Sequence, residues 1–238
     1  MEFLFILTVA LLSPILLWLY ILKKDTKKEP VSWLLKATLW GVAISIPVAF
    51  FEQALEFLLF GEGGKPTSIL GTTALAFVVA ALTEETFKLL ALWLVLRRNP
   101  YFDEHFDGIV YAVCVGLGFA AIENIGYVFG ENGGITTAVI RALLAVPGHY
   151  AFAILMGYYY SLYHFVDRSP RVAVSILLVP VLAHGVYDSF AMSGMVNPMV
   201  GGVSFFLLVF FCIKMHKFSK EKVKAQIERD KNETNEIF

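Results

Sequence analysis

Long apolar blocks constrain the fold of this chain more than any other feature of its sequence. Each block holds about 20 mostly apolar residues, the length at which a helix spans the hydrocarbon layer of a membrane. Of the 238 residues, 58% are hydrophobic and 16% are charged, whereas soluble domains have about 25% charged residues. Since a backbone in lipid must satisfy its hydrogen bonds within its own segment, the blocks predict an all-α, polytopic bundle of transmembrane helices.

We expect about seven spans with short polar connections. Their ranges are 2–22, 33–60, 69–96, 107–130, 137–164, 172–191 and 199–214. The first block is too long for a signal peptide and begins with Glu2 rather than with basic residues, so we interpret it as a span. The spans predict a single transmembrane domain, 1–214. The charged cytoplasmic tail, 215–238, is expected to begin as a short helix and to fade into disorder.

Lysines and arginines alternate between successive connections. The first, third and fifth connections and the tail contain Lys23, Lys24, Lys27, Lys28, Arg97, Arg98, Arg168, Arg171 and the tail lysines from Lys214 onward. In the second, fourth and sixth connections, Lys65 is the only lysine or arginine. Because basic connections remain in the cytoplasm, this pattern predicts an N-terminus outside and a C-terminus inside a plasma membrane of the bacterial type.

Ionisable side chains at membrane depth are costly unless they are paired or hydrated, and they therefore mark function. The third predicted span holds Glu84, Glu85 and Lys88 near its middle. The two glutamates point about 100° apart on a helix, and Lys88 lies one turn beyond, near both. Lys88 can neutralise one carboxylate and leave the other for proton transfer or metal binding. The alternative is an ion pair that joins two helices, which two adjacent glutamates fit badly.

Two further spans carry isolated polar residues. Glu123 and Asn124 follow Gly116 and Gly118, small residues that let helices approach closely. Glu123 is therefore expected to face a packed helix or a cavity, either as a functional group or as an interhelical hydrogen-bond partner. His149 lies midway along the fifth span, and taken alone it favours a packing role.

The sixth span carries His184 and Asp188 one turn apart, on one face of a helix. Asp188 could orient the imidazole and fix its tautomer, as carboxylates do beside metal-ligating or catalytic histidines. A purely structural His–Asp pair explains the spacing equally well.

Other charged residues receive a structural interpretation. Arg141, near the outer end of the fifth span, is more ambiguous, and extension of its side chain to the membrane interface is one interpretation. Asp103, Glu104, His105 and Asp107 precede the fourth span, where they predict a solvated connection in which Asp107 caps the following helix.

The candidate residues lie at overlapping depths in four spans. Near the middle lie Glu84, Glu85, His149 and His184, and nearer the outer face lie Glu123 and Asp188. This coincidence predicts one polar cavity that opens outward.

Such a cavity is suited to hydrolysis. Glutamate and histidine are zinc ligands, and a catalytic zinc keeps three protein ligands and a water that becomes hydroxide near neutral pH. A remaining glutamate can act as general base and then give the proton to the leaving amine. The His-Glu-x-x-His motif is absent, which excludes a zincin-type site. A metal-free glutamate protease, a proton-coupled transporter or a lipid-processing protein would use the same residues, and the spacing does not separate them.

Five segments in order resemble the motifs of the PrsW intramembrane proteases, relatives of the CAAX-protease and bacteriocin-processing (Abi) superfamily. They are 84–88 (EETFK, an EExxK element), 102–111 (FDEHFDGIVY), 116–124 (GLGFAAIEN), 141–149 (beginning RALL and ending in His149) and 184–188 (HGVYD). Ala112 departs from the pattern, because the family has glycine after the tyrosine, but it involves none of the candidate residues.

The resemblance implies a membrane protease, classed as a metalloprotease. The resemblance covers roughly residues 78–190, and by it the first catalytic candidates are Glu84, Glu85 and His184, followed by His149 and Glu123. Our hypothesis takes Glu84 or Glu85 as general base, and His149 and His184 as zinc ligands or as groups that orient the water. Glu123 is then a further zinc ligand or a contact that supports one. The supporting residues are Lys88, Asn124 and Asp188. The best-known members make the first, extracytoplasmic cut in a single-span anti-sigma factor during envelope stress. The expected partners are therefore a membrane protein substrate and the lipid bilayer, without nucleic acid.

Overall fold

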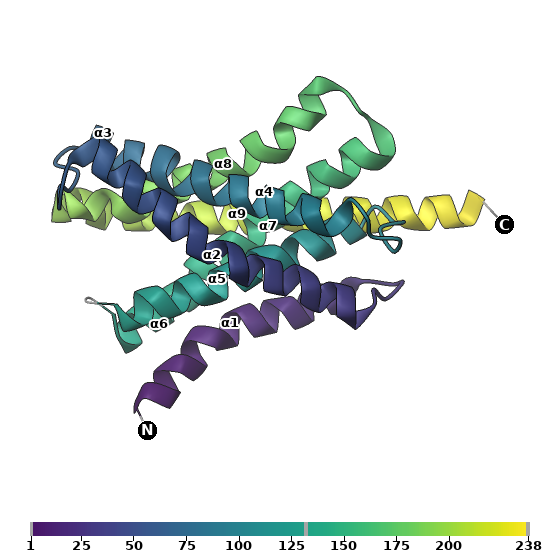
Figure 1. The fold of residues 1–238 in the computed structure, drawn as a ribbon, viewed down its shortest axis with the longest axis horizontal. Helices are drawn as coiled ribbons and strands as arrows, with labels where there is room; N and C mark the ends of the chain where they lie inside the picture. Colours follow the sequence, from purple (N-terminus) through teal and green to yellow (C-terminus); the bar gives the residue numbers. More distant parts are fainter. Residues whose placement is uncertain (1, 131–132, 237–238) are drawn as a thin grey trace.

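The protein is all-helical (Figure 1). The computed structural model describes residues 2–130 and 133–236, and no strand occurs within those ranges. The α-helices are α1 (Glu2–Lys24), α2 (Val31–Phe60), α3 (Ile69–Ala74), α4 (Leu82–Leu96), α5 (Asp107–Phe129), α6 (Ile135–Leu143), α7 (Ala145–Ser161), α8 (Pro170–Met192) and α9 (Pro198–Glu236). Shorter helical segments are the π-helices η1 (Leu75–Ala81) and η2 (Leu162–Val166) and the 3₁₀ turn η3 (Ser193–Met195).

The helices make about seven passes through the bundle. In the described parts of the chain, 6 helices are long and apolar enough to cross a membrane. A further pass, 69–96, runs without a break through α3, η1 and α4, but the π-helical segment divides it into shorter pieces. The prediction of an all-α, polytopic bundle with about seven spans is therefore confirmed.

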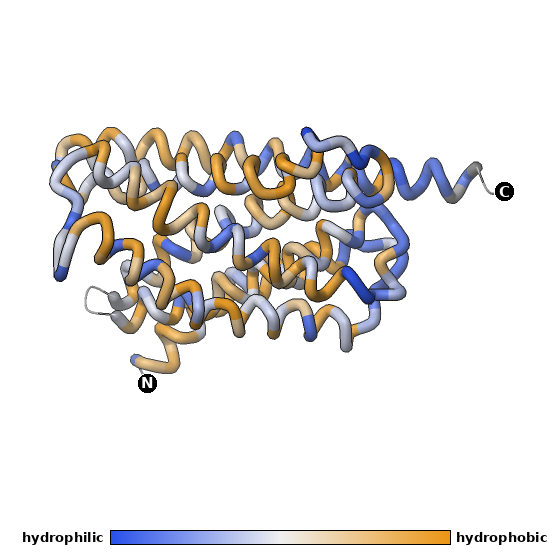
Figure 2. The backbone as a smooth tube through the Cα atoms, turned by 45° about the horizontal axis from the view of Figure 1, so that its top comes forward, coloured by the Kyte–Doolittle hydropathy of each residue, from blue (hydrophilic) through white to orange (hydrophobic). Residues whose placement is uncertain are grey.

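The basic connections lie together at one end of the bundle, which we call the basic end (connections 25–30, 97–106 and 167–169). Lys27 Nζ lies 2.6 Å from Asp103 Oδ2 and links two of these connections. Figure 2 shows hydrophilic chain gathered at this end, from which α9 extends. Connections 61–68 and 193–197 lie at the other end, which we call the far end, and the two chain termini point in opposite directions (Figure 1). Which end faces the cytoplasm stays a prediction.

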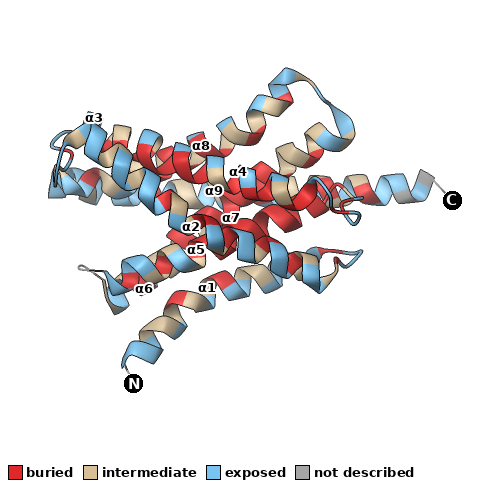
Figure 3. Ribbon diagram, viewed as in Figure 1, coloured by how far each residue is buried: buried red, intermediate tan, exposed pale blue. Residues whose placement is uncertain are grey.

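Helix α5 is the centre of the bundle, and most of its residues are buried (Figure 3). Small residues let α2 approach it at backbone distance. A Cβ atom at Gly118 would lie 2.2 Å from Thr38 O, and one at Gly41 would lie 2.0 Å from Val115 O. The predicted role of the small residues before Glu123 therefore holds at Gly118, where any side chain would push the two helices apart.

The fifth predicted span is divided at Leu144, whose φ of −122° and ψ of −55° separate α6 from α7. Pro147 follows the break, and it has no N–H to donate to the preceding turn. Ser13 Oγ donates to Ala142 O at 2.8 Å, so a neighbouring helix satisfies a carbonyl beside the break. The division lets Arg141 of α6 and His149 of α7 approach the Glu123 carboxylate from different directions.

The expectation of a tail that fades into disorder is wrong for the described residues. Helix α9 continues without interruption to Glu236. Asp230 accepts hydrogen bonds from His105 N at 2.6 Å and Phe106 N at 2.9 Å, and His105 Nε2 lies 2.8 Å from Glu233 Oε1. The N–H groups at the beginning of a helix have no partner within the helix. Asp230 accepts hydrogen bonds from two N–H groups directly before α5 and so satisfies them. These contacts hold the tail in place.

Replacing Gly118 with alanine is expected to destabilise the bundle by about 1–3 kcal/mol, the usual cost of overpacking a tight contact. The matched control is Gly126→Ala on the same helix, because no atom lies within 4 Å of a Cβ added there. Thermal unfolding in detergent measures both variants. Equal unfolding temperatures would contradict the backbone contact of α2 with α5.

Candidate active site

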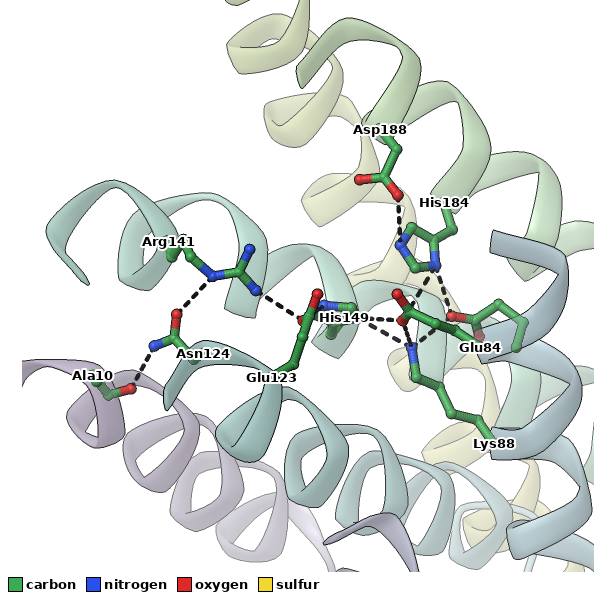
Figure 4. Close-up of polar contacts among 10 residues, drawn as sticks. Ala10, Glu84, Lys88, Glu123, Asn124, Arg141, His149, His184 and Asp188 are labelled. Atoms are coloured by element: carbon green, nitrogen blue, oxygen red, sulfur yellow. Dashed lines mark hydrogen bonds and ion pairs between the residues drawn. The ribbon is translucent and has the colours of Figure 1, made fainter. Parts of the chain in front are cut away.

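Four buried side chains meet where α4, α7 and α8 cross the middle of the bundle (Figure 4). They are Glu84, Glu85, His149 and His184, and one ligand atom of each lies within 4.8 Å of the others. No more than 4% of the surface of any of the four is exposed. The structure thus brings together all the candidates that the sequence places near the middle of their spans.

Lys88 links the two glutamates. Its Nζ lies 2.8 Å from Glu84 Oε2 and 2.9 Å from Glu85 Oε1, and 3.2 Å from His149 Nδ1. It also lies 4.3 Å from the centroid of the Phe119 ring, whose face attracts cations. Lys88 therefore contacts both carboxylates, as the helical spacing predicts, and its charge offsets theirs away from water.

The two histidines have similar neighbours. His184 turns Nδ1 toward Glu85 Oε1, at 3.0 Å, and Nε2 toward Asp188 Oδ2, at 3.2 Å. His149 turns Nδ1 toward the same centre and Nε2 toward Glu123 Oε2, at 2.7 Å. Each imidazole thus meets an outer carboxylate with one nitrogen and presents the other to the centre. Metal-ligating histidines have this arrangement, because the outer carboxylate fixes the tautomer and the orientation of the ring.

A chain of polar contacts continues outward from Glu123. Arg141 Nη2 lies 2.8 Å from Glu123 Oε2, and Arg141 Nε donates to Asn124 Oδ1 at 2.8 Å. Asn124 Nδ2 donates in turn to Ala10 O of α1, at 2.7 Å. The expectation that Arg141 extends to the membrane interface is wrong, because Glu123 and Asn124 satisfy its donors inside the bundle. Asn124 therefore connects Arg141 with α1.

A cavity of about 750 Å³ connects the cluster with the far end of the bundle. Glu84, His149 and His184 line it, together with residues of and near η3 such as Gly194. Glu85 is 0% exposed and does not line the cavity. A polar cavity at this depth agrees with the prediction from sequence, whereas the direction in which the far end faces stays a prediction.

Glu52 of α2 also lines the cavity and is absent from the candidates derived from the sequence. Its carboxyl lies in the electrostatic field of Glu84 and Glu123. The rule that singles out the other residues would have found it, since Glu52 is an ionisable residue inside the apolar block 33–60. Its position suits contact with a molecule that enters the cavity.

The donor atoms of the cluster fit a metal ion. Two imidazoles and two carboxylates are ligands that zinc takes. Glu85 Oε2 is buried and has no hydrogen-bond partner among the residues described, so a carboxylate oxygen remains open to a ligand. Lys88 Nζ contacts Glu84, Glu85 and His149, and its single charge balances only one of the two carboxylates. The cluster thus fits a metal ion by the chemistry of its donor atoms.

The fold and the cluster together define a polytopic membrane protein with a buried Glu/His centre. The family model described as "PrsW family intramembrane metalloprotease" matches residues 29–215, which include every candidate residue of the site. The chain belongs to the PrsW family of intramembrane proteases.

Curated relatives agree with this assignment. The chain is 37% identical to "Protease PrsW" of Geobacillus kaustophilus over 181 residues, 76% of this chain and 74% of the relative. It is 32% identical to "Protease PrsW" of Clostridioides difficile over 225 residues, 92% of this chain and 90% of the relative. The protein of the same name from Bacillus subtilis is 36% identical over 175 residues, 73% of this chain and 76% of the relative. No solved structure matches the chain significantly.

Asp188→Asn is expected to lower proteolytic activity by about 10- to 100-fold, the usual effect of removing a group that orients a ligand. The protein should stay folded, since His184 keeps its contact with Glu85. Initial rates of cleavage in reconstituted membranes, with thermal unfolding beside them, measure the effect. Asp167→Asn is the control, because the Asp167 carboxylate accepts from Ser169 N and Ser169 Oγ in an exposed connection outside the cluster. Full activity of Asp188→Asn would contradict an orienting role.

Proposed function

We propose that this chain is a zinc-dependent endopeptidase that hydrolyses peptide bonds of membrane proteins in the cavity beside Glu84. The observation that carries the proposal is the arrangement of the two histidines. Each directs Nδ1 to the glutamate pair while its Nε2 meets a carboxylate, Glu123 for His149 and Asp188 for His184. Metal-ligating histidines have this arrangement, and a metal-free glutamate protease would use the same imidazoles, so the zinc content of the active protein separates the two mechanisms.

The proposed ligands are His149, His184 and Glu85. All three are buried, and the open Oε2 atom of Glu85 supplies a further donor. A zinc ion held there supplies a bound water that is acidic enough to form hydroxide near neutral pH. Glu123, which the sequence offers as a ligand, serves in this proposal to orient His149, because its carboxylate contacts His149 Nε2 and Arg141.

Glu84 is the proposed general base. It lines the cavity beside both histidines, whereas Glu85 does not reach the cavity. A base must lie within hydrogen-bond reach of the water and of the leaving group, so the glutamate that faces the cavity suits the task. Glu84 would take a proton from water and deliver it to the departing amine. Lys88 holds the Glu84 carboxylate in place at 2.8 Å and offsets the charge of the pair.

The proposed substrate is a single-span membrane protein, and the family resemblance points to an anti-sigma factor. A groove of about 820 Å³ between α2 and α5 reaches Glu52 and Glu123, which also line the active-site cavity. Exposed apolar residues such as Phe50 line the groove, and they suit the side chains of a transmembrane segment. With the basic end in the cytoplasm of a bacterial cell membrane, the cavity extends toward the outer face, where the first cut in such a factor falls.

Glu84→Gln and Glu85→Gln distinguish the two proposed roles. Glu84→Gln should lose cleavage by about 100-fold or more, as expected for a general base, while it keeps zinc near one ion per chain. Glu85→Gln should lose both cleavage and zinc. Elemental analysis of detergent-purified protein and a cleavage assay in liposomes measure the two quantities.

Glu56→Gln is the matched control for this pair, since Glu56 lines the same cavity without belonging to the metal-binding cluster. It should keep both zinc and activity. Zinc lost from Glu84→Gln but kept in Glu85→Gln would reverse the two assignments. Metal-free protein that cleaves at the full rate would refute the zinc mechanism.

The substrate class has its own test. A single-span anti-sigma factor encoded by the same genome should be cut in liposomes by the unmodified chain and left intact by Glu84→Gln. Mass spectrometry of the fragments should place the cut on the side of the span opposite its cytoplasmic domain. A cut on the cytoplasmic side would contradict the proposed orientation. If the anti-sigma factor stays intact while a generic membrane substrate is cleaved, the proposed substrate is refuted but the protease activity is not.

A further inference from the structure

A second group of carboxylates meets at the basic end. Asp25 lies in the connection between α1 and α2, Glu104 in the connection before α5, and Asp107 at the first residue of α5. One carboxylate oxygen of each lies within 4.8 Å of the others. Asp25 is 4% exposed and Asp107 is 0% exposed, while Glu104 is half-buried. The interpretation of the segment before α5 as a solvated connection is therefore wrong at His105, which is 2% exposed, and at Asp107. The prediction that Asp107 caps the helix is also wrong, because Phe106 occupies the N-cap position and Asp107 is the first residue of α5.

Two carboxylate oxygens of this group are buried without a hydrogen-bond partner. Asp107 Oδ2 accepts from Asp103 N at 3.0 Å and Glu104 N at 2.7 Å, which fixes the side chain in the turn before α5. Asp107 Oδ1 has no partner among the residues described. Asp25 Oδ2 accepts from Glu29 N at 3.4 Å, and Asp25 Oδ1 likewise has no partner. Buried carboxylate oxygens are costly unless they are paired or coordinate a metal.

The charge of the group is poorly balanced. Lys27 pairs with the exposed Asp103, and Lys28 Nζ donates to the carbonyl oxygens of Leu22 and Asp25 rather than to a carboxylate. Glu29, whose N–H donates to Asp25 Oδ2, adds a further carboxylate, which accepts from Tyr111 Oη. A positive charge among these groups would stabilise their ionised forms.

We propose that Asp25, Glu104 and Asp107 bind a hard divalent cation, calcium or magnesium, at a second metal site. An all-oxygen set of carboxylates is the set that these cations prefer, with waters completing the shell. Two oxygens on one ion lie no farther apart than twice the metal–oxygen distance, about 5 Å for calcium and about 4 Å for magnesium. The three oxygens lie within 4.8 Å of one another, a spacing that fits the larger calcium ion.

The second metal site would stabilise the fold and would take no part in peptide hydrolysis. Asp107 precedes Glu123 by 16 positions on α5, a separation of about 24 Å along the helix. A cation held by the three carboxylates joins the α1–α2 connection to the beginning of α5. Asp230 of α9 bonds to His105 and Phe106 in the same region, so the cation would stabilise the end of the bundle on which the tail docks.

The experiment uses the full chain with His184→Ala, which disables the Glu/His cluster and leaves the second site intact. After chelation and dialysis, calcium and magnesium chloride are titrated separately by calorimetry, and thermal unfolding is followed with and without each ion. We expect one ion per chain, tighter binding of calcium than of magnesium, and a higher unfolding temperature with the ion. Glu104→Gln should weaken binding at least about tenfold, as the loss of a metal-site carboxylate does.

Asp103→Asn is the matched control, since it removes the same charge from the same connection but not from the cluster, and it should change the affinity by less than about twofold. Asp107→Asn is a second variant, needed if Glu104 contributes weakly to the affinity. It should abolish cation binding, and the protein should stay folded, because the asparagine oxygen still accepts from the N–H groups of residues 103 and 104. Absence of binding by the parent chain would overturn the proposal. Binding that survives both Glu104→Gln and Asp107→Asn would also overturn it, because the ion would then lie elsewhere.

Discussion

The contact of Lys88 with Glu84, Glu85 and His149 is the interaction on which the rest of the structure depends. Charges taken out of water cost several kcal/mol each, and removing one partner of a buried pair typically costs about 3–5 kcal/mol. The glutamates and Lys88 come from one helix, but His149 and His184 come from α7 and α8. Only a bundle that holds α4, α7 and α8 together satisfies this group, so the polar centre and the packing of the helices stabilise each other.

The packing around α5 makes that convergence possible. Backbone contact at Gly41 and Gly118 brings α2 against α5, and the break at Leu144 lets α6 and α7 reach Glu123 with Arg141 and His149. A helical tail packed on the basic end completes the frame through Asp230. The two ends of the bundle therefore differ in structure. The cavity beside the Glu/His cluster lies toward the far end, whereas long-range polar contacts close the basic end.

Local chemistry explains how much of the site was predictable. The neutralising role of Lys88 follows from helical spacing of three and four residues, and the structure has both contacts. The orienting pair of His184 with Asp188 follows from the same spacing. Arg141 could not be placed in this way, because its partners Glu123 and Asn124 belong to another helix. The division of roles between Glu84 and Glu85 depends on which carboxylate faces the cavity, and adjacency in sequence carries no information about that.

The sequence by itself determined the all-helical class, the approximate spans, the gathering of basic connections at one end and the list of ionisable residues at membrane depth. These follow from apolar length and charge, which act locally along the chain. Only the tertiary structure decided that Lys88 meets His149 across 61 positions, that Glu85 meets His184 across 99, and that His105 meets Asp230 across 125. Such contacts are set by which helix faces pack together, and that choice depends on the whole bundle rather than on any single segment.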